Sequence, residues 1–218
     1  SIITFNYDLL LDLAFHQNGI GTDYCLENQT ANKGYKLLKL HGSMNWAIHE
    51  NCTAQNSGIY VVKLDDLLSH RLVSPKVVKL NAFASLRKAP CQACLKQGLT
   101  PVFIPPTWTK TPSLSGLSNV WAAAAAEIQN AEQFVVIGYS LPQTDTFFQY
   151  LLALGLRKNN KLNRIIIVNP DTTPEYRKRF RSIFNQNIKV QSISEDFGDA
   201  ITFEKFVNTQ PEYIAKYT

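Results

Sequence analysis

The sequence predicts an α/β fold, a Rossmann-like, doubly wound parallel sheet that carries a small inserted module. Short apolar segments alternate with amphipathic segments at both ends of the chain, which is typical of parallel strands joined by helices. Residues 46–112 lose this alternation and contain three of the four cysteines. We therefore expect residues 1–45 and 113–218 to form the Rossmann-like domain and residues 46–112 to form the insert.

The N-terminal part of the chain reads as strand, helix, strand. Residues 2–5 predict a strand, and residues 8–16 predict a helix with an acidic residue in its first turn, ended by Asn18 and Gly19. After a polar connection, residues 37–40 predict a second, buried strand that stops at a histidine and a glycine. The predicted apolar face of the helix consists of Leu9, Leu10, Leu13 and Ala14.

Regular alternation returns after the insert. We expect Asn119 to cap a helix over residues 120–131. The continuous apolar run over residues 134–138 predicts a strand buried on both faces. Further strands are predicted over residues 164–168 and 188–193, and further helices over residues 145–157, 174–184 and 199–208; inside the insert, a short strand is predicted over residues 59–63.

The composition indicates a globular protein and argues against a membrane protein and a nucleic-acid-binding protein. The 218 residues are 45% hydrophobic and 18% charged, as in an ordinary globular protein, and no apolar run approaches the roughly 20 residues of a membrane helix. The net charge is +5, but the basic run over residues 177–181 is typical of a solvated helix face, so we expect no nucleic-acid partner. Four cysteines without a secretory signal favour a reducing, cytoplasmic compartment.

Polar residues follow the predicted strands where each strand ends. These segments are residues 4–8 (TFNYD), 41–43 (HGS), 138–140 (GYS) and 169–171 (NPD). Because parallel strands end at the same edge of a sheet, we expect the segments to share one rim and to line a dinucleotide-sized cleft. The histidine among them is the side chain most easily poised as a base near neutral pH.

In their order along the chain, these segments resemble the motifs of the sirtuin-like superfamily. Residues 40–46 (LHGSMNW) and 138–145 (GYSLPQTD) are similar to bacterial sirtuin-like domains, many of which serve in phage defence as NAD-consuming effectors. The resemblance spans nearly the whole chain. It implies that the ligand or substrate is NAD and that the activity is hydrolysis of NAD to nicotinamide and ADP-ribose.

The resemblance also implies a role for individual residues. Asn6 would orient the ribose or the attacking water, and His41 would be the general base. Asp8 would lie near the nicotinamide amide. The other residues implied to bind NAD are Gly138 and Ser140 at the phosphates, Asn169 at the adenosine ribose, and Thr4, Gly42 and Asp171.

The residue types suit this reaction. Cleavage of the nicotinamide–ribose bond develops an oxocarbenium-like transition state, and the leaving group departs neutral, so little acid catalysis is needed. Positioning, a polar amide at the ribose and one base to accept a proton are the main requirements. Asn6 and His41 supply the amide and the base without metal chemistry.

Three departures from the sirtuin pattern leave alternatives open. Sirtuins carry a strand and a glycine-rich phosphate loop before the first motif, and we expect these to lie upstream of Ser1 in a longer parent chain. Phe5 stands where sirtuins usually have Gln. Pro105 and Pro106 remove backbone donors where deacylases pair with a peptide, which disfavours deacylation. The alternatives are a module that senses NAD or ADP-ribose without turnover and an NAD-dependent protein deacylase.

A pair of short cysteine motifs predicts a structural zinc site in the insert. Cys91 and Cys94 have the same two-residue separation as His49 and Cys52, and together they make a Cys₃His set. A module with little apolar periodicity can bury only a small core and needs a cross-link such as a bound metal to be stable. The alternative is a lone Cys-x-x-Cys with an exposed histidine. Besides NAD, the partners considered are other domains of a longer chain and a second copy of this chain.

Overall fold

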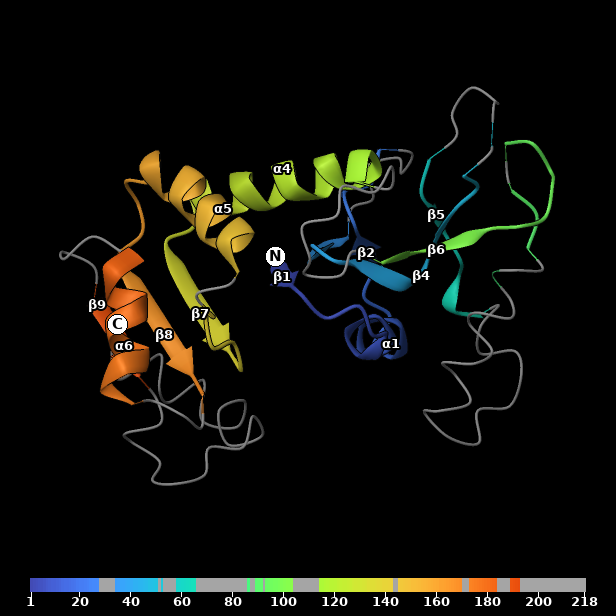
Figure 1. Cartoon of the computed structure of the whole chain (residues 1–218). Helices are drawn as coiled ribbons and strands as arrows, with labels where there is room; N and C mark the ends of the chain where they lie inside the picture. Colours follow the sequence, from blue (N-terminus) through green and yellow to red (C-terminus); the bar gives the residue numbers. More distant parts are fainter. Residues whose placement is uncertain are drawn as a thin grey trace. The chain divides into compact units, whose positions relative to one another are not determined.

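A computed structural model of the 218-residue chain shows two compact units, Ser1–Ala124 and Ala125–Thr218 (Figure 1). The predicted α/β class is confirmed, because both units contain helices and parallel strand pairs, and in the second unit helices alternate with strands. The structure describes residues 1–27, 34–50, 52, 58–65, 86, 89–91, 93–103, 114–142, 145–169, 173–183 and 189–192.

A three-stranded parallel sheet opens the first unit. Its order is β1 (Ile2–Thr4), β3 (Tyr35–Lys39) and β2 (Thr22–Asp23). The two predicted strands are present, and β2 lies in the segment that we expected to be a plain connection. The side chains of Leu37 and Leu38 are fully buried, so β3 is a core strand.

Helix α1 (Leu10–Gln17) follows β1. The carboxylate of Asp8 accepts a hydrogen bond from the backbone N–H of Leu10 at 2.9 Å, but Leu9 is the residue at the N-cap position, so Asp8 precedes the helix and does not begin it. The helix ends as predicted, since Gly19 has a positive φ of 65° and its N–H donates to the carbonyl of His16.

The predicted apolar face of α1 was partly wrong. Leu10 is 70% exposed, whereas Asp12 is only 1% exposed. The physical reason is that Asp12 pairs with a buried lysine of β3, so a charged residue occupies a position that periodicity alone assigns to an apolar one.

An antiparallel sheet completes the first unit. Its order is β5 (Tyr60–Val61), β4 (Gly42–Ile48) and β6 (Thr100–Phe103). Strand β4 begins almost directly after β3, so residues 40 and 41 form a tight turn, and Gly42 and Ser43, which we expected in a loop, already belong to a second strand. Strand β4 also runs through residue 46, where we placed the start of the insert.

The long helix α4 (Leu114–Asn130) begins before Asn119, so the prediction that Asn119 caps it was wrong. The second unit contains the parallel sheet β7 (Gln133–Ile137), β8 (Arg164–Val168) and β9 (Lys189–Ser192) in that order. Helix α5 (Thr146–Arg157) follows β7, and helix α6 (Pro174–Ile183) follows β8.

Strands β7 and β8 differ in burial. Central strand β8 is buried from Ile165 to Val168, as predicted. In β7, however, Val135 and Ile137 are 42% and 47% exposed, so the prediction of a strand buried on both faces was wrong there. Alternate side chains point to opposite faces of a strand, and only one face of β7 is partly covered.

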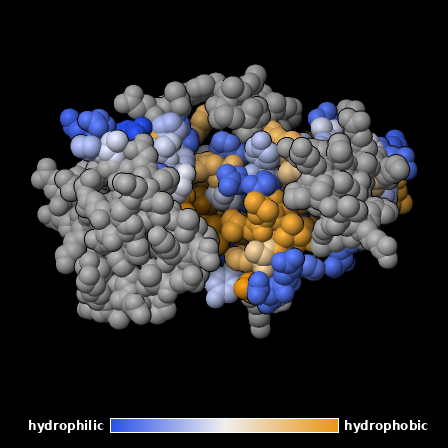
Figure 2. All heavy atoms as spheres, turned by 90° about the horizontal axis from the view of Figure 1, so that it is seen from below, coloured by the Kyte–Doolittle hydropathy of each residue, from blue (hydrophilic) through white to orange (hydrophobic). Residues whose placement is uncertain are grey.

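On the face drawn in Figure 2, hydrophobic residues (orange) lie at the surface next to hydrophilic residues (blue). The described residues include no helix long and apolar enough to cross a membrane. Three of our predictions lie outside the described residues: the helix over residues 199–208, the proline pair at positions 105 and 106, and the ligand role of Asp171.

Candidate functional site

The carboxyl ends of β1 and β3 bring two of the polar segments together. The parallel register pairs Thr4 with Lys39. Just beyond the strands, the N–H of Leu40 donates to the carbonyl of Thr4 at 3.0 Å, and the N–H of Met44 donates to the carbonyl of Tyr7 at 2.9 Å. Residues 4–8 and residues 41–43 therefore leave the first unit's parallel sheet at the same edge.

The side chains of Asn6 and His41 differ in exposure. Asn6 is exposed, and its backbone N–H donates to the hydroxyl of Thr4 at 3.1 Å. His41 is half-buried, and its ring meets the ring of Phe5 edge to face, with 5.4 Å between centroids. Phe5, the residue that departs from the sirtuin pattern, thus forms one wall around the imidazole.

Gly42 makes the turn after His41 possible. Its φ of +84° lies in the left-handed region that favours glycine. A Cβ at this position would lie 2.1 Å from the carbonyl oxygen of Val102 on β6. Only a residue without a side chain fits here, so β4 can start directly beside β6.

A buried polar network lies beneath the two segments, and sequence reasoning missed it. The ammonium of Lys39 is 2.8 Å from a carboxylate oxygen of Asp12 and 2.7 Å from the hydroxyl of Ser43. The hydroxyl of Tyr24 donates to the other oxygen of Asp12 at 2.5 Å, and Ser43 donates to the side chain of Asn45 at 2.7 Å. The available signal was a lysine inside the apolar run over residues 37–40.

The network also reaches the first polar segment. The Lys39 ammonium donates to the backbone carbonyl of Asp8 at 2.5 Å. Burial lowers the pKa of Lys39, and the charge of Asp12 opposes that change. Burial, and next the charge of Asp12, raise the pKa of Tyr24. The network therefore holds an ion pair and a neutral phenol in the interior of the first unit.

In the second unit, the loops after β7 and β8 are joined by Tyr176 of α6. The buried Tyr176 hydroxyl donates to the carbonyl of Tyr139 at 2.6 Å and accepts a hydrogen bond from the side-chain amide of Asn169 at 3.2 Å. Gly138 and Ser140 are exposed, and Gly138 has a positive φ of 63°. Among the residues we assigned to NAD, the structure groups Gly138, Ser140 and Asn169 here, and it groups Thr4, Asn6, Asp8, His41 and Gly42 in the first unit.

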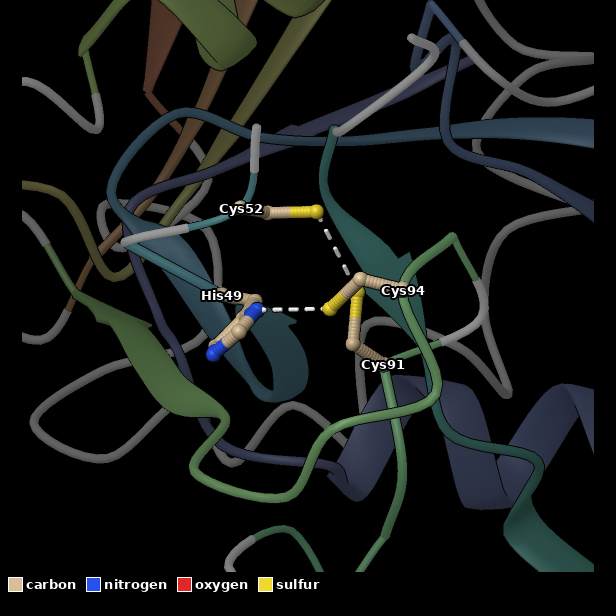
Figure 3. A group of neighbouring side chains, drawn as sticks. All are labelled: His49, Cys52, Cys91 and Cys94. Atoms are coloured by element: carbon tan, nitrogen blue, oxygen red, sulfur yellow. Dashed lines mark hydrogen bonds between the residues drawn. The ribbon is translucent and has the colours of Figure 1, made fainter. Parts of the chain in front are cut away.

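The four predicted zinc ligands lie together (Figure 3). The ligand atoms of His49, Cys52, Cys91 and Cys94 are all within 4.8 Å of one another. Cys94 Sγ lies 3.1 Å from His49 Nδ1, and Cys91 Sγ lies 3.7 Å from Cys52 Sγ. Each pair sits on a short turn, and none of the four side chains is fully exposed.

The surroundings of Cys91 favour its metal-binding form. Burial alone would raise the pKa of this thiol, but hydrogen bonds from the Tyr60 hydroxyl and from the backbone N–H groups of Cys94 and Ala93 outweigh burial and lower the pKa to about 6. The thiolate is the form that binds metals. Three thiols and one imidazole are a known structural zinc set, so the donor set fits zinc.

The fold and these sites define an α/β protein with polar loops at the ends of parallel strands and a separate Cys₃His cluster. A family model described as a SIR2-like domain matches residues 1–78 of the 218-residue chain. The matched part contains Asn6, His41 and the first pair of cluster residues. The match supports the resemblance to the sirtuin-like superfamily and an NAD-related function at the level of the family. Comparison with curated proteins finds no match.

Proposed function

We propose that this chain binds NAD and hydrolyses it to nicotinamide and ADP-ribose. The observation that carries the proposal is the register of β1 with β3, which puts the segments of Asn6 and His41 at one edge of a parallel sheet. Ligands of open α/β sheets bind at that edge. The biological setting that we propose is antiphage defence, because residues 40–46 and 138–145 resemble bacterial sirtuin-like effectors.

In the proposed reaction, the bond between the ribose C1′ and the nicotinamide nitrogen breaks, and its electron pair stays on the nicotinamide. Water then forms the new bond to C1′ and gives up a proton. The exposed amide of Asn6 orients the ribose or the water, and the imidazole of His41 accepts the proton. The edge-on contact of His41 with Phe5 supports this role, because positioning contributes much of the rate.

The remaining NAD-binding residues belong to the same proposal. In the first unit, they are Thr4, Asp8 and Gly42, which flank the two segments. In the second unit, they are Asn169 and Gly138, and their support is that the hydrogen bonds of Tyr176 join Asn169 to the backbone of Tyr139 beside Gly138. The further proposed ligands there are Ser140 and Asp171.

We also propose that His49, Cys52, Cys91 and Cys94 hold one zinc ion with a structural role. Four protein ligands leave no open position for water, as in structural sites. Bound zinc would link two turns of the chain and supply folding free energy to the antiparallel sheet beside them.

Release of nicotinamide from NAD tests the proposed activity. We expect the complete protein that carries residues 1–218 to release nicotinamide in its active assembly, and Asn6→Ala and His41→Ala each to lower the rate by about 10²–10⁴-fold. His16→Ala is the matched control, since His16 is exposed and pairs with Asp65 at the surface. Wild-type rates in both site variants would overturn the catalytic roles.

Two further measurements separate the alternatives. Calorimetric titration with NAD and with ADP-ribose detects a sensor, which binds the ligand without releasing nicotinamide. Incubation with NAD and an acyl-lysine peptide detects a deacylase, which releases nicotinamide only when the peptide is present. Turnover of NAD with water alone supports hydrolysis.

A further inference from the structure

We propose that Lys39 is a positioning residue of the NAD site, whose buried ammonium fixes the segment of Asn6 relative to the segment of His41. This inference rests on the proposed function, because it concerns the two residues to which we assign the chemistry. Lys39 donates to residues near them in sequence, Asp8 and Ser43.

The contacts of the ammonium carry the argument. One N–H donates to the carbonyl of Asp8, two residues after Asn6, and another donates to the hydroxyl of Ser43, two residues after His41. The third is directed to the carboxylate of Asp12 on α1. All three donors of the ammonium are therefore used within the protein, and one contact falls on each polar segment.

The burial of Lys39 separates this role from direct binding of NAD. Its side chain is 1% exposed and that of Asp12 is 0% exposed, so the ammonium does not face a ligand phosphate. Replacing a buried ion pair by apolar residues is often neutral or stabilising. The Lys39 ammonium, however, also donates to one residue in each of the two segments. It therefore fixes the geometry between these segments, which a pair of apolar side chains could not do.

Without the ammonium, the backbone bonds from Leu40 to Thr4 and from Met44 to Tyr7 would still join the two segments. The carbonyl of Asp8 and the hydroxyl of Ser43 would lose their shared partner. A displacement of about 1 Å of a reacting group can cost on the order of 100-fold in rate. We therefore expect loss of Lys39 to act on the chemical step more than on the affinity for NAD.

The test compares Lys39→Met/Asp12→Asn with Tyr24→Phe in the complete protein. The double variant removes both buried charges together and so leaves no unpaired charge. Tyr24→Phe perturbs the same carboxylate from its other side but leaves the contacts of Lys39 with Asp8 and Ser43 in place. Thermal unfolding, kcat and KM for NAD, and amide hydrogen exchange over residues 4–8 and 40–44 are measured for each.

We expect kcat of the double variant to fall by about 10-fold or more, with KM changed by less than about 3-fold, because positioning acts on the transition state. Tyr24→Phe should keep kcat within about 2-fold and lose only stability. Equal loss of kcat in the two variants, or a loss confined to KM, would overturn the inference.

Hydrogen exchange keeps the two proposals distinguishable. Faster exchange of both segments in the double variant, but not in Tyr24→Phe, is expected whether or not the protein turns over NAD. A wild-type protein that never consumes NAD would overturn the proposed function. Unchanged exchange in the double variant would overturn the role of Lys39 independently.

Discussion

His41 and His49 lie at opposite ends of one strand, directly before and directly after β4 (Gly42–Ile48). The first is the proposed base, and the second belongs to the Cys₃His cluster. Strand β6 pairs with both ends of β4, and β4 is buried from Gly42 to Ala47. The cluster and the proposed catalytic turn are therefore attached to the same buried strand.

The first prediction concerns metal content. Elemental analysis of purified protein should find about one zinc per chain, because the donor set matches a structural zinc site. Cys91→Ser should lose the metal, while Cys25→Ser should retain it, since Cys25 lies outside the cluster. A wild-type protein without zinc, or a Cys91→Ser variant that keeps it, would contradict the proposed site.

Removal of the metal should also affect the catalytic turn. We expect a chelator to lower the thermal midpoint of the wild-type protein and to lower the rate of NAD hydrolysis, because metal binding supplies folding free energy to the sheet that contains β4. Cys91→Ser should show no further change when the chelator is added. Full activity of metal-free protein would show that the cluster does not support β4.

Gly42 should tolerate substitution worse than Gly138. Both have positive φ, but an added Cβ at Gly42 meets the carbonyl oxygen of Val102, whereas at Gly138 it meets nothing within 4 Å. Gly138→Ala should therefore cost about 1–2 kcal/mol of unfolding free energy, the price of backbone strain alone. Gly42→Ala should cost clearly more. Equal losses in denaturant unfolding would show that β6 moves away at no cost.

Tyr176→Phe should weaken binding of ADP-ribose, because the loops after β7 and β8 lose their shared hydroxyl. We expect about 10-fold weaker affinity by calorimetric titration, which corresponds to about one hydrogen bond. Tyr150→Phe is the control, since Tyr150 is 64% exposed. Unchanged affinity in Tyr176→Phe would separate these loops from the nucleotide.

Tyr24 should make stability depend on alkaline pH. Its pKa in the folded protein is raised, by burial first and then by the charge of Asp12, above the ordinary value of 10.0. The stability linked to this group is thus fully present below pH 10 and falls at higher pH, because the unfolded chain then releases a proton that the folded chain retains. Urea unfolding between pH 8 and pH 11 should show a steeper decline for the wild type than for Tyr24→Phe. Parallel declines would contradict the raised pKa.

The parts of the fold that residue type and spacing predict are those that depend on local pattern. The strand over residues 164–168 has the bounds we predicted, because a short unbroken run of β-branched apolar residues strongly favours a buried strand. The cluster of His49, Cys52, Cys91 and Cys94 was predicted from the equal spacing within two short motifs, because a structural zinc ion needs four ligands and each motif supplies two.

The parts that were missed depend on partners far away in the sequence. Ser43 and Asn45 made the start of β4 look like a polar loop. Both are nevertheless buried, because Ser43 accepts a hydrogen bond from Lys39 and Asn45 donates one to the carbonyl of Val62. Asp12 was missed for the same reason. A polar residue enters the interior only when its partner is present, and no local pattern reveals that partner.

The Cys₃His cluster has a consequence for the connectivity of the chain. Its two ligand pairs come from either side of the segment between residues 52 and 91, so a bound ion would close that segment into a loop, as a disulfide does. Closing a loop of roughly 40 residues removes chain entropy from the unfolded state worth about 4 kcal/mol. A single cut by a protease inside this loop would then leave the two pieces joined through the metal as well as through the pairing of β4 with β6, and chelation would weaken their association.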